Sequence, residues 1–519
     1  MAPGVSRPAA HGETNRSTKE ETVSRTSIYR IRRAFVAVGL VALAGGSLAA
    51  PAAAADTGVQ STYLVLYTAG ARTTGAQKAV ESAGGTLVAD YSAIGVVVAR
   101  SSRSDFSAAV GRSRGVDSAV ATGQFATKVT DTSSEQPVAA AAATWGDSLS
   151  GLQWDMRQIN VPQAHAINSG IRSVVVGDID TGLDFTHPDL APNYDASRST
   201  DCSSGTPQPL AVGNDKNGHG THTAGTIAAA ANGTGIVGVA PNVSIAGIKS
   251  SNDDGFFFPE MVICSFVWAA THGIDVTNNS YFADPWLFNC RNDAGQRAIW
   301  NAERRAIGYA QHNGVLVVAA EGNESTDLTH PTTDVVSPDF PPNSSVERDV
   351  TNACAVVPVE VPGVVGVTAT GNKRLKSFYS SYGTSSADVA APGGDSILQL
   401  TADAPNGRVL STFSSVGTIC LPRRLVVENG AKYCYLQGTS MASPHASGVA
   451  ALLLSAHRAM TSGQLSAALQ GATNALSCPD TSIYAAFPQN SGAPQTCQGG
   501  SGHNSFYGSG EVDALKAVQ

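Results

Sequence analysis

From residue 145 onward, short runs of apolar residues alternate with longer stretches of helical spacing. The apolar runs are rich in Val and Ile and predict buried strands at residues 174–179, 245–248, 315–320 and 364–368. The stretches between them predict helices at residues 222–231, 259–272, 296–312 and 440–457. Near-continuous apolar strands that alternate with helices are typical of a parallel sheet covered on both faces. We therefore expect an α/β fold, a mostly parallel sheet with helices on both faces.

An earlier segment, residues 56–130, has a different pattern and predicts a small α+β unit. Its expected elements are strands at residues 61–67 and 94–99 and helices at residues 76–83 and 106–112. A Ser- and Ala-rich stretch follows at residues 131–144. Because such a composition cannot bury enough apolar surface to fold, we expect an exposed linker that a protease can cut. The α/β domain is then residues 145–519.

The first 55 residues have the pattern of an export signal. Positive charge at residues 30–33 precedes an apolar run at residues 34–48, and a small-residue, Ala-rich stretch follows. The run is too short for a membrane span, although an N-terminal membrane anchor is the alternative interpretation. Arg32-Arg33 leaves twin-arginine export open beside the general secretory route. We predict a signal peptide over residues 1–55 and a secreted, extracellular protein.

Composition narrows the functional class. The chain has 519 residues and a net charge of −8, so it offers no basic footprint for nucleic acid. The eight Cys residues all lie at or after Cys202, and an even number in an exported chain indicates disulfides. We expect the local pairs Cys420–Cys434 and Cys478–Cys497, and Cys290–Cys354 is our choice among the other four. The absence of a CxxC motif argues against zinc or dithiol redox chemistry.

Three segments carry candidate catalytic groups. Asp180 ends a predicted buried strand, His219 lies in a turn between two Gly residues, and Ser440 begins a predicted helix. A serine hydroxyl needs a base to take its proton, and the base needs a carboxylate that fixes its tautomer. Ser440 would lie at the positive end of its helix, where free N–H groups can stabilise an oxyanion. The three groups together predict nucleophilic catalysis.

Two further polar residues have a structural interpretation. His222 follows His219 by three residues, and we expect it to be a hydrogen-bonded structural histidine. Asp178 precedes Asp180 by two residues and therefore shares its face of the strand. If both carboxyl groups are buried near each other, their titrations would be coupled. The alternative, which we favour, is that Asp178 is a structural acid with its own hydrogen-bond partners.

The three segments resemble the signatures of the subtilisin family of serine proteases. Asp-Thr-Gly from Asp180, His-Gly-Thr-His from His219 and Gly-Thr-Ser-Met-Ala-Ser-Pro-His around Ser440 match them almost letter for letter. The resemblance, which extends over about residues 174–514, implies that Asp180 orients the base, His219 is the general base and acid, and Ser440 is the nucleophile. It also implies that the side-chain amide of Asn323, after a predicted strand, donates to the oxyanion.

The resemblance further implies that an extended peptide binds by strand addition to two backbone edges. The residues concerned are Gly255, Phe256 and Phe257 on one edge and Ser280, Tyr281 and Phe282 on the other. The family usually has small residues here, so the aromatic side chains of residues 256–258 and of Tyr281 and Phe282 are a departure. They either narrow the cleft and favour large apolar substrate residues, or pack under a neighbouring loop.

A calcium site common in the family is also implied. The side chains of Asp189 and Asn232 and the carbonyls of Ala230, Thr234 and Ile236 would form an oxygen cage, as a hard cation prefers. The alternative is that Asp189 forms a turn or cap and no ion binds. The chemistry itself requires no cofactor.

The predicted function is that of a secreted serine endopeptidase made as a self-processed precursor. Residues 56–130 resemble the inhibitory prosegment of the family by size, pattern and position. The expected partners are polypeptide substrates and the chain's own prosegment, without nucleic acid or stable membrane insertion, and we expect a monomer.

Three alternatives remain open. A leader- or precursor-processing peptidase of narrow specificity is favoured by the aromatic edges and by an insertion at residues 327–352. An inactive binding protein on the same scaffold is disfavoured because all four chemical groups are intact. An acid-active protease of the sedolisin type would have a carboxylic acid in place of His219.

Overall fold

A computed structural model of the chain describes residues 56–122, 145–341 and 343–519. The predicted signal peptide and linker lie outside the described residues, as does the end of the 56–130 segment. Within the described ranges, no helix combines the length and the apolar character needed to cross a membrane.

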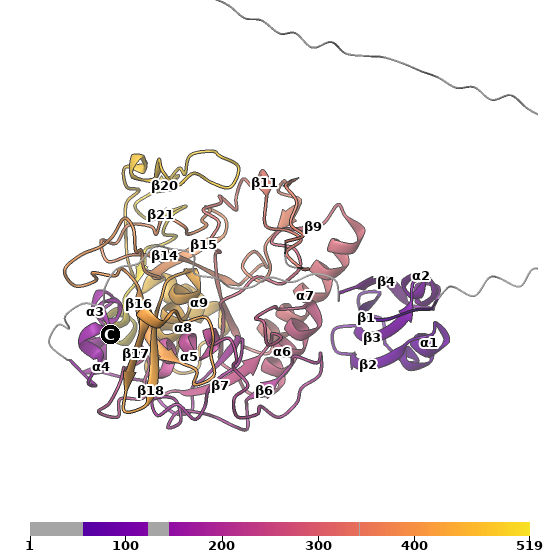
Figure 1. Cartoon of the computed structure of the whole chain (residues 1–519), viewed down its shortest axis with the longest axis horizontal. Coiled ribbons are helices and arrows are strands. Elements are labelled where there is room, and N and C mark those ends of the chain that lie inside the picture. The colour runs from indigo at the N-terminus through magenta and orange to yellow at the C-terminus, as the bar shows by residue number, and fades with distance from the viewer. Residues whose placement is uncertain (1–55, 123–144, 342) are drawn as a thin grey trace, which may run out of the picture. The chain divides into compact units, whose positions relative to one another are not determined.

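A nine-stranded sheet forms the centre of the α/β domain (Figure 1), in the order β19-β22-β15-β14-β10-β8-β5-β7-β6. Its strands are β5 (Val175–Asp180), β6 (Thr200–Asp201), β7 (Ser244–Lys249), β8 (Val276–Asn279), β10 (Leu316–Ala320), β14 (Val365–Thr370), β15 (Ala387–Pro392), β19 (Thr473–Asn474) and β22 (Glu511–Val512). All neighbouring pairs are parallel except β19 with β22. The predicted fold class is confirmed.

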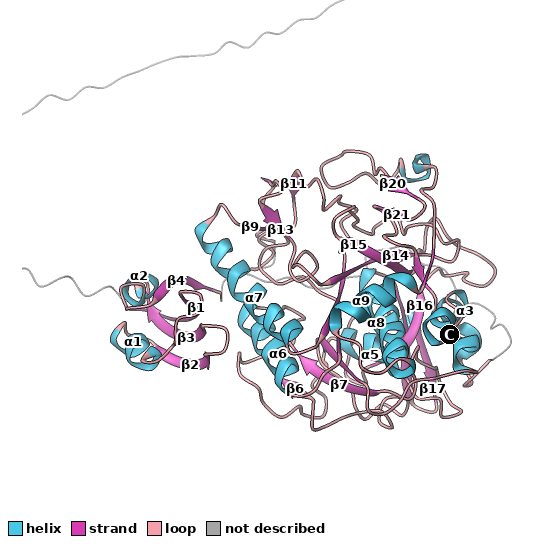
Figure 2. Cartoon of the chain, turned by 180° about the vertical axis from the view of Figure 1, so that it is seen from behind, coloured by secondary structure: helices cyan, strands magenta, loops and turns pink. Residues whose placement is uncertain are grey.

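Helices cover both faces of this sheet (Figure 2). They are α3 (Trp154–Gln158), α4 (Val161–His165), α5 (His219–Ala228), α6 (Pro259–Thr271), α7 (Ala294–His312), α8 (Thr439–Ala456), α9 (Ser462–Gly471) and α10 (Ala514–Val518), with 3₁₀ turns at Ser150–Leu152, Pro422–Arg424 and Thr481–Tyr484. Val175 and Ile179 of β5 pack in the cluster that holds α6 and α7 side chains, whereas Val176 packs with α5 and α8. The alternation follows from the period of two along a strand.

The N-terminal unit is a four-stranded antiparallel sheet, in the order β2-β3-β1-β4, with two short helices. Its elements are β1 (Asp56–Tyr67), α1 (Ala76–Ser82), β2 (Thr86–Tyr91), β3 (Val96–Arg103), α2 (Phe106–Val110) and β4 (Val116–Ala121). Val65 of β1 packs beneath its own helices, whereas Leu64 and Leu66 point the other way and join the cluster of α6 and α7. Arg305 of α7 donates to the Tyr67 carbonyl at 2.9 Å. The small sheet therefore uses its second face to bind the α/β domain.

Four disulfides link the α/β domain: Cys202–Cys264, Cys290–Cys354, Cys420–Cys434 and Cys478–Cys497. The three predicted pairs are confirmed, and the fourth joins the two Cys residues that remained. Short ladders accompany them: β9 (Asn289–Cys290) with β13 (Cys354–Ala355), β11 (Thr333–Asp334) with β12 (Arg348–Asp349), β20 (Gly499–Gly500) with β21 (His503–Asn504), and β18 (Ala431–Leu436) between β16 (Val409–Phe413) and β17 (Leu425–Glu428).

Two local expectations were wrong. His219 is not in a turn: it is the first residue of α5, whose N-cap is Gly218 with φ of 100°. Gly220 is required because a Cβ there would collide with the Gly182 carbonyl. The helix therefore begins three residues earlier than apolar spacing predicts, since its first turn is polar.

Candidate active site

The three predicted catalytic residues lie at the ends of regular elements. Asp180 is the last residue of β5, His219 the first residue of α5 and Ser440 the second residue of α8. The carboxyl ends of parallel strands and the N-termini of the helices that follow meet at one edge of such a sheet. This edge holds a carboxylate, an imidazole and a hydroxyl.

Asp180 and His219 form a buried pair. The Nδ1–H of His219 donates to Oδ1 of Asp180 at 2.8 Å, and the Thr181 N–H donates to the same oxygen at 2.7 Å. The two side chains are 0 % and 1 % exposed. Burial lowers the pKa of His219, but the Asp180 carboxylate and its hydrogen bond raise it by more, so the net pKa lies above its ordinary value. Asp180 thus fixes the imidazole with Nε2 available as a base.

Ser440 is held by the neighbouring strand end. Its hydroxyl donates to the Ser280 carbonyl at 3.1 Å, and the Ser280 hydroxyl donates to the Ser440 carbonyl at 3.0 Å. Within the described residues, Nε2 of His219 has no hydrogen-bond partner. Hydrogen bonds between nucleophile and base are often loose without substrate. The hydroxyl and Nε2 are thus the two groups that remain to be joined when substrate binds.

Asn323 supplies a side-chain amide beside the nucleophile. It follows β10, and its Oδ1 accepts from the Thr439 N–H at 2.9 Å and from the Thr439 hydroxyl at 3.1 Å. With the oxygen fixed in this way, the Nδ2 group is left to donate. The Ser440 N–H lies in the first turn of α8, where backbone donors are not used within the helix. The Asn323 amide and the Ser440 N–H are therefore two hydrogen-bond donors that remain available near the Ser440 hydroxyl.

We expect Asn323→Ala to lower kcat by about 10²–10³-fold, the scale known for this residue type in a subtilisin, with little change in KM. The amide is used only when the oxyanion develops. Steady-state kinetics on one peptide amide would measure the effect. Asn313→Ala is the control, because that Asn caps the C-terminal end of α7 and is remote from the chemistry. An unchanged kcat in Asn323→Ala would exclude the amide from the oxyanion hole.

Residues 172–510 match the model of the Subtilase family. The chain belongs to the subtilase family. It is 31 % identical to subtilisin DY of Bacillus licheniformis over 56 % of its length and 81 % of the relative, and 29 % identical to fervidolysin of Fervidobacterium pennivorans over 60 % of its length. The match spans only 39 % of fervidolysin. The chain is therefore a subtilisin-family serine endopeptidase.

Solved structures share the fold of this subtilase. The crystal structure of fervidolysin aligns with a TM-score of 0.61 at 24 % identity, over 89 % of this chain and 61 % of that one. The epidermin leader peptide processing protease of Staphylococcus aureus aligns with a TM-score of 0.62 at 22 % identity, over 89 % and 99 %. At these identities the comparison shows the fold alone.

The subtilase positions His219 through a residue that the sequence reasoning missed. Asp215 accepts from the Gly218 N–H at 2.8 Å, the Thr221 N–H at 2.9 Å and the Thr181 hydroxyl at 2.9 Å. It therefore caps α5 and ties the start of this helix to the residue after Asp180. An Asp three residues before the first Gly of a Gly-His-Gly segment is the signal that could have identified it.

His222 lies on the buried side of α5. Its Nε2 is bonded to the Cys434 carbonyl at 3.0 Å. Burial and the proximity of His219 lower the pKa of His222 to about 3, so this imidazole stays neutral. The prediction of a hydrogen-bonded structural histidine is confirmed.

Asp178 lies at the junction of the catalytic elements. It is 2 % exposed, and it accepts from Nδ2 of Asn278 at 2.9 Å and from the Thr223 hydroxyl at 2.8 Å. Asn278 is in β8 and in turn accepts from the Ser443 hydroxyl of α8 at 2.7 Å. Burial, followed by the charge of Asp180, raises the pKa of Asp178 well above its ordinary value. This acid therefore has partners on α5 and β8, as the favoured structural interpretation requires.

The aromatic residues at the predicted peptide edges pack against protein. The Phe257 ring stacks on Tyr281 with 4.2 Å between centroids, and Phe340 from the insertion contacts Phe256 and Phe258 at 5.5 and 5.8 Å. Phe282 is half-buried. The interpretation in which these side chains pack under a neighbouring loop holds for Phe256 and Phe258, whereas Phe257 packs on Tyr281 of the opposite edge.

The two side chains implied for calcium have hydrogen bonds within their loop, and one carboxylate oxygen of Asp189 is left over. Oδ2 of Asp189 accepts from the Ile236 N–H at 3.0 Å, and Oδ1 of Asn232 accepts from the Thr234 N–H at 3.0 Å. Each of these oxygens accepts one N–H and keeps a second lone pair, and within the described residues the buried Oδ1 of Asp189 has no hydrogen-bond partner, so the loop retains oxygens that could hold a hard cation. The Asp147 carboxylate accepts from the N–H groups of Asn232 and Gly233 in the same loop, at 2.8 and 2.9 Å. No cluster of three acidic, His or Cys ligands occurs among the described residues. The carbonyl of the fifth residue, Ala230, belongs to the same loop.

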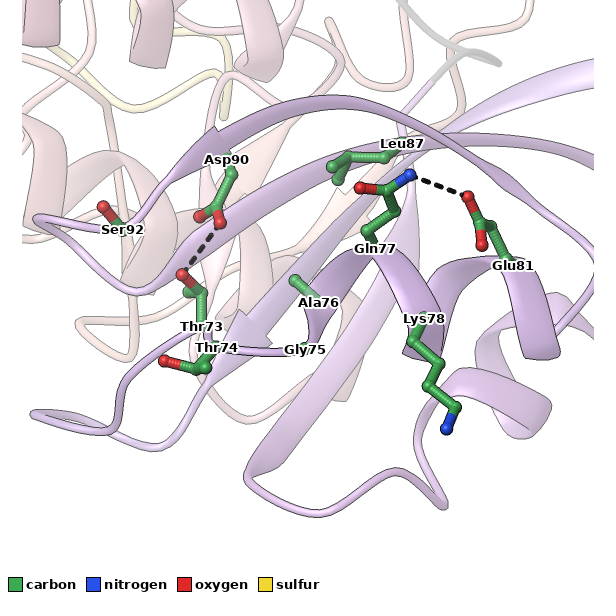
Figure 3. A pocket seen from close by; sticks show the side chains of 10 residues that line it. All are labelled: Thr73, Thr74, Gly75, Ala76, Gln77, Lys78, Glu81, Leu87, Asp90 and Ser92. Carbon is green, nitrogen blue, oxygen red and sulfur yellow. Dashed lines mark hydrogen bonds between the residues drawn. The ribbon is translucent and has the colours of Figure 1, made fainter.

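A pocket on the N-terminal unit is a separate feature (Figure 3). It lies between α1 and β2, where the Thr73 hydroxyl donates to Asp90 at 3.0 Å and Gln77 donates to Glu81 at 3.0 Å. Its lining contains no histidine and no cysteine, so it does not repeat the Asp, His and Ser groups found at the sheet edge.

Proposed function

We propose that this subtilase is a secreted endopeptidase, made as a precursor that removes its own prosegment. The observation that carries the proposal is the Asp180–His219 pair at the sheet edge beside Ser440 and the Asn323 amide. These four groups suffice for acyl transfer.

The chemistry follows from the geometry. Nε2 of His219 takes the proton as the Ser440 Oγ attacks the peptide carbonyl carbon, and the resulting oxyanion receives hydrogen bonds from Asn323 Nδ2 and the Ser440 N–H. The imidazolium then donates its proton to the leaving amine, which departs and leaves an acyl-enzyme. A water molecule, deprotonated by His219, hydrolyses the ester and returns Ser440.

The packing of the N-terminal unit supports the precursor part of the proposal. The sheet of residues 56–122 buries Leu64, Leu66 and Val98 in the cluster of α6 and α7, and the Tyr91 hydroxyl donates to the Gly205 carbonyl at 2.5 Å. A unit docked in this way can assist folding and inhibit the protease until the linker is cut. Export is supported by the four disulfides, since such bonds persist in oxidising compartments.

Two measurements test the proposal. A fluorophosphonate should label Ser440 in the purified protein, and the label should be lost in His219→Ala. Absence of labelling in a folded wild-type protein would instead favour the inactive binding protein. A peptide-library cleavage profile would then separate a general endopeptidase from a leader- or precursor-processing peptidase.

Calcium removal tests the ligand set implied by the resemblance. Because Oδ1 of Asp189 is buried without a hydrogen-bond partner among the described residues, we expect calcium to bind there and a chelator to lower Tm relative to millimolar calcium. For a micromolar site the shift would be roughly 5 °C under these conditions. The shift should disappear in Asp189→Asn, and an unchanged Tm in the wild-type protein would contradict a calcium site in this loop.

A further inference from the structure

Phe257, the last residue of one predicted peptide edge, is bonded to Asp284, which lies two residues beyond the other edge. The Phe257 N–H donates to Oδ2 of Asp284 at 2.6 Å, and the Asp284 N–H donates to the Phe257 carbonyl at 3.0 Å. Both polar groups of the Phe257 backbone are thus used within the protein. Asp284 is 0 % exposed and Phe257 is 1 % exposed. We call this contact the Asp284 clamp.

An added strand needs space as well as hydrogen-bonding groups. Neighbouring strands lie about 4.7–4.9 Å apart, so two edges that receive a peptide between them must stand about 9–10 Å apart. Two edges that are hydrogen-bonded directly to each other stand only one strand spacing apart. A peptide can therefore not pass between Phe257 and Asp284.

The clamp is supported from both sides. The Phe257 ring stacks on Tyr281 with an interplanar angle of 4°, and the Tyr281 hydroxyl donates to Asn279 at 3.1 Å. On the outer side, Phe340 of the insertion packs edge-on against the two neighbouring Phe rings. The clamp is thus part of the core and does not depend on one exposed side chain.

The position of the clamp can be counted from the nucleophile. Ser280 is bonded to Ser440 and therefore marks the substrate residue at the cut. Successive residues of a strand direct their polar groups to opposite sides. The first and third residues upstream of the cut would thus pair with Ser280 and Phe282, and the second and fourth with Gly255 and Phe257.

Only the fourth of these pairings is blocked. Among the described residues, no hydrogen bond uses the Phe282 backbone or the Gly255 carbonyl, while the Phe256 backbone is turned away and bonded to Asn252. We propose that the Asp284 clamp closes the groove beyond the third residue upstream of the cut, so that substrate recognition by strand addition ends there. This inference rests on the proposed function.

A series of substrates of increasing length tests the proposal. Acetylated peptides with a fluorogenic amide after the same residue would carry two, three, four or five residues upstream of the cut. In the wild-type protein, expressed as the full chain, the third residue should raise kcat/KM by about fivefold or more, because it gains two backbone hydrogen bonds. The fourth and fifth residues should change it by less than about twofold.

Variants at Asp284 provide the matched comparison. Asp284→Ala removes the side-chain bond to the Phe257 N–H but keeps the backbone bond from the Asp284 N–H to the Phe257 carbonyl, so the groove should stay closed and the fourth residue should still change kcat/KM by less than about twofold. Asp284→Asn keeps an acceptor for the Phe257 N–H, and its kcat/KM should not rise when the peptide is extended beyond the third residue. Fluorophosphonate labelling would verify that each variant has a folded active site.

The outcomes distinguish the clamp from the proposed function. A tenfold gain from the fourth residue in a wild-type protein that is labelled at Ser440 overturns the clamp and leaves the endopeptidase standing. A folded wild-type protein that is neither labelled nor active on any peptide overturns the proposed function itself. If Asp284→Ala fails to fold, the wild-type series still decides.

Discussion

Replacing Ser440 by Ala is expected to lower kcat by about 10⁶-fold, the scale known for the nucleophile of a subtilisin. The substitution removes only the hydroxyl group. The rate that remains above that of the uncatalysed reaction in water would come from the oxyanion hole and substrate binding. The side chain is buried at the N-terminus of α8 and bonded to the Ser280 carbonyl. Loss of one such hydrogen bond costs the fold only about 1 kcal/mol.

The same variant tests self-processing. If Ser440 cuts the linker, the intact mass of purified Ser440→Ala should include the 56–122 unit, while the wild type should lack it. Ser455→Ala is the matched control, because its hydroxyl lies on the same helix and is bonded only to the Ala451 carbonyl at 2.7 Å. Equal trimming of the wild type and Ser440→Ala, in a host without secreted proteases, would contradict self-processing.

The catalytic residues could be predicted because their chemistry is written in contiguous segments. Asp180, His219 and Ser440 each lie beside Gly, Thr or Ser residues that a strand end or a helix start requires. The strands that consist almost entirely of apolar residues could also be predicted from the sequence. By contrast β8 was missed, because its sequence Val-Thr-Asn-Asn has no apolar run although all four residues are buried. Its Asn side chains are satisfied by long-range partners that no local pattern reveals.

The walls of the site depend on contacts between distant segments. The sequence shows three consecutive Phe residues from Phe256, but only the fold brings Phe340 against them across more than eighty positions. The Asp284 clamp joins residues 27 positions apart and has no sequence signature. The surroundings of Asp189 also depend on a distant segment, since the N–H that bonds its Oδ2 comes from Ile236. Motifs thus predict reacting groups better than they predict what surrounds them.

The two carboxyl groups of β5 should respond to the same substitution in opposite ways. Asp180→Asn is expected to lower kcat by about 10⁴-fold, because an amide in place of the carboxylate stabilises the wrong tautomer of His219 and offers no charge to the imidazolium. Asp178→Asn should keep kcat within about tenfold of the wild type, which is about 1.4 kcal/mol in the barrier. Kinetics at one pH above the His219 pKa would compare them.

The reason for the difference is the protonation of Asp178. Burial, the charge of Asp180 and that of Asp215 all raise its pKa, so the folded protein holds it neutral over a range of pH where an exposed Asp is ionised. An Asn at this position keeps an oxygen for the Asn278 amide and turns its NH₂ toward the Thr223 hydroxyl, which can donate to the Gly220 carbonyl. A 10⁴-fold loss in Asp178→Asn would show that the ionised carboxylate supports His219.

Stability gives a second and independent readout of the same group. An acid whose folded pKa is raised destabilises the protein as pH rises from its unfolded pKa, near 3.8, toward its folded pKa, because only the unfolded chain ionises freely in that window. Asn does not titrate, so Asp178→Asn should gain Tm relative to the wild type as pH is raised from 4 to 7. The difference should be smallest at pH 4, where the unfolded Asp is only about half ionised and the folded Asp is neutral. A Tm difference that is independent of pH would mean that Asp178 is ionised in the folded enzyme at its ordinary pKa, and the catalytic comparison would then have to be explained by charge.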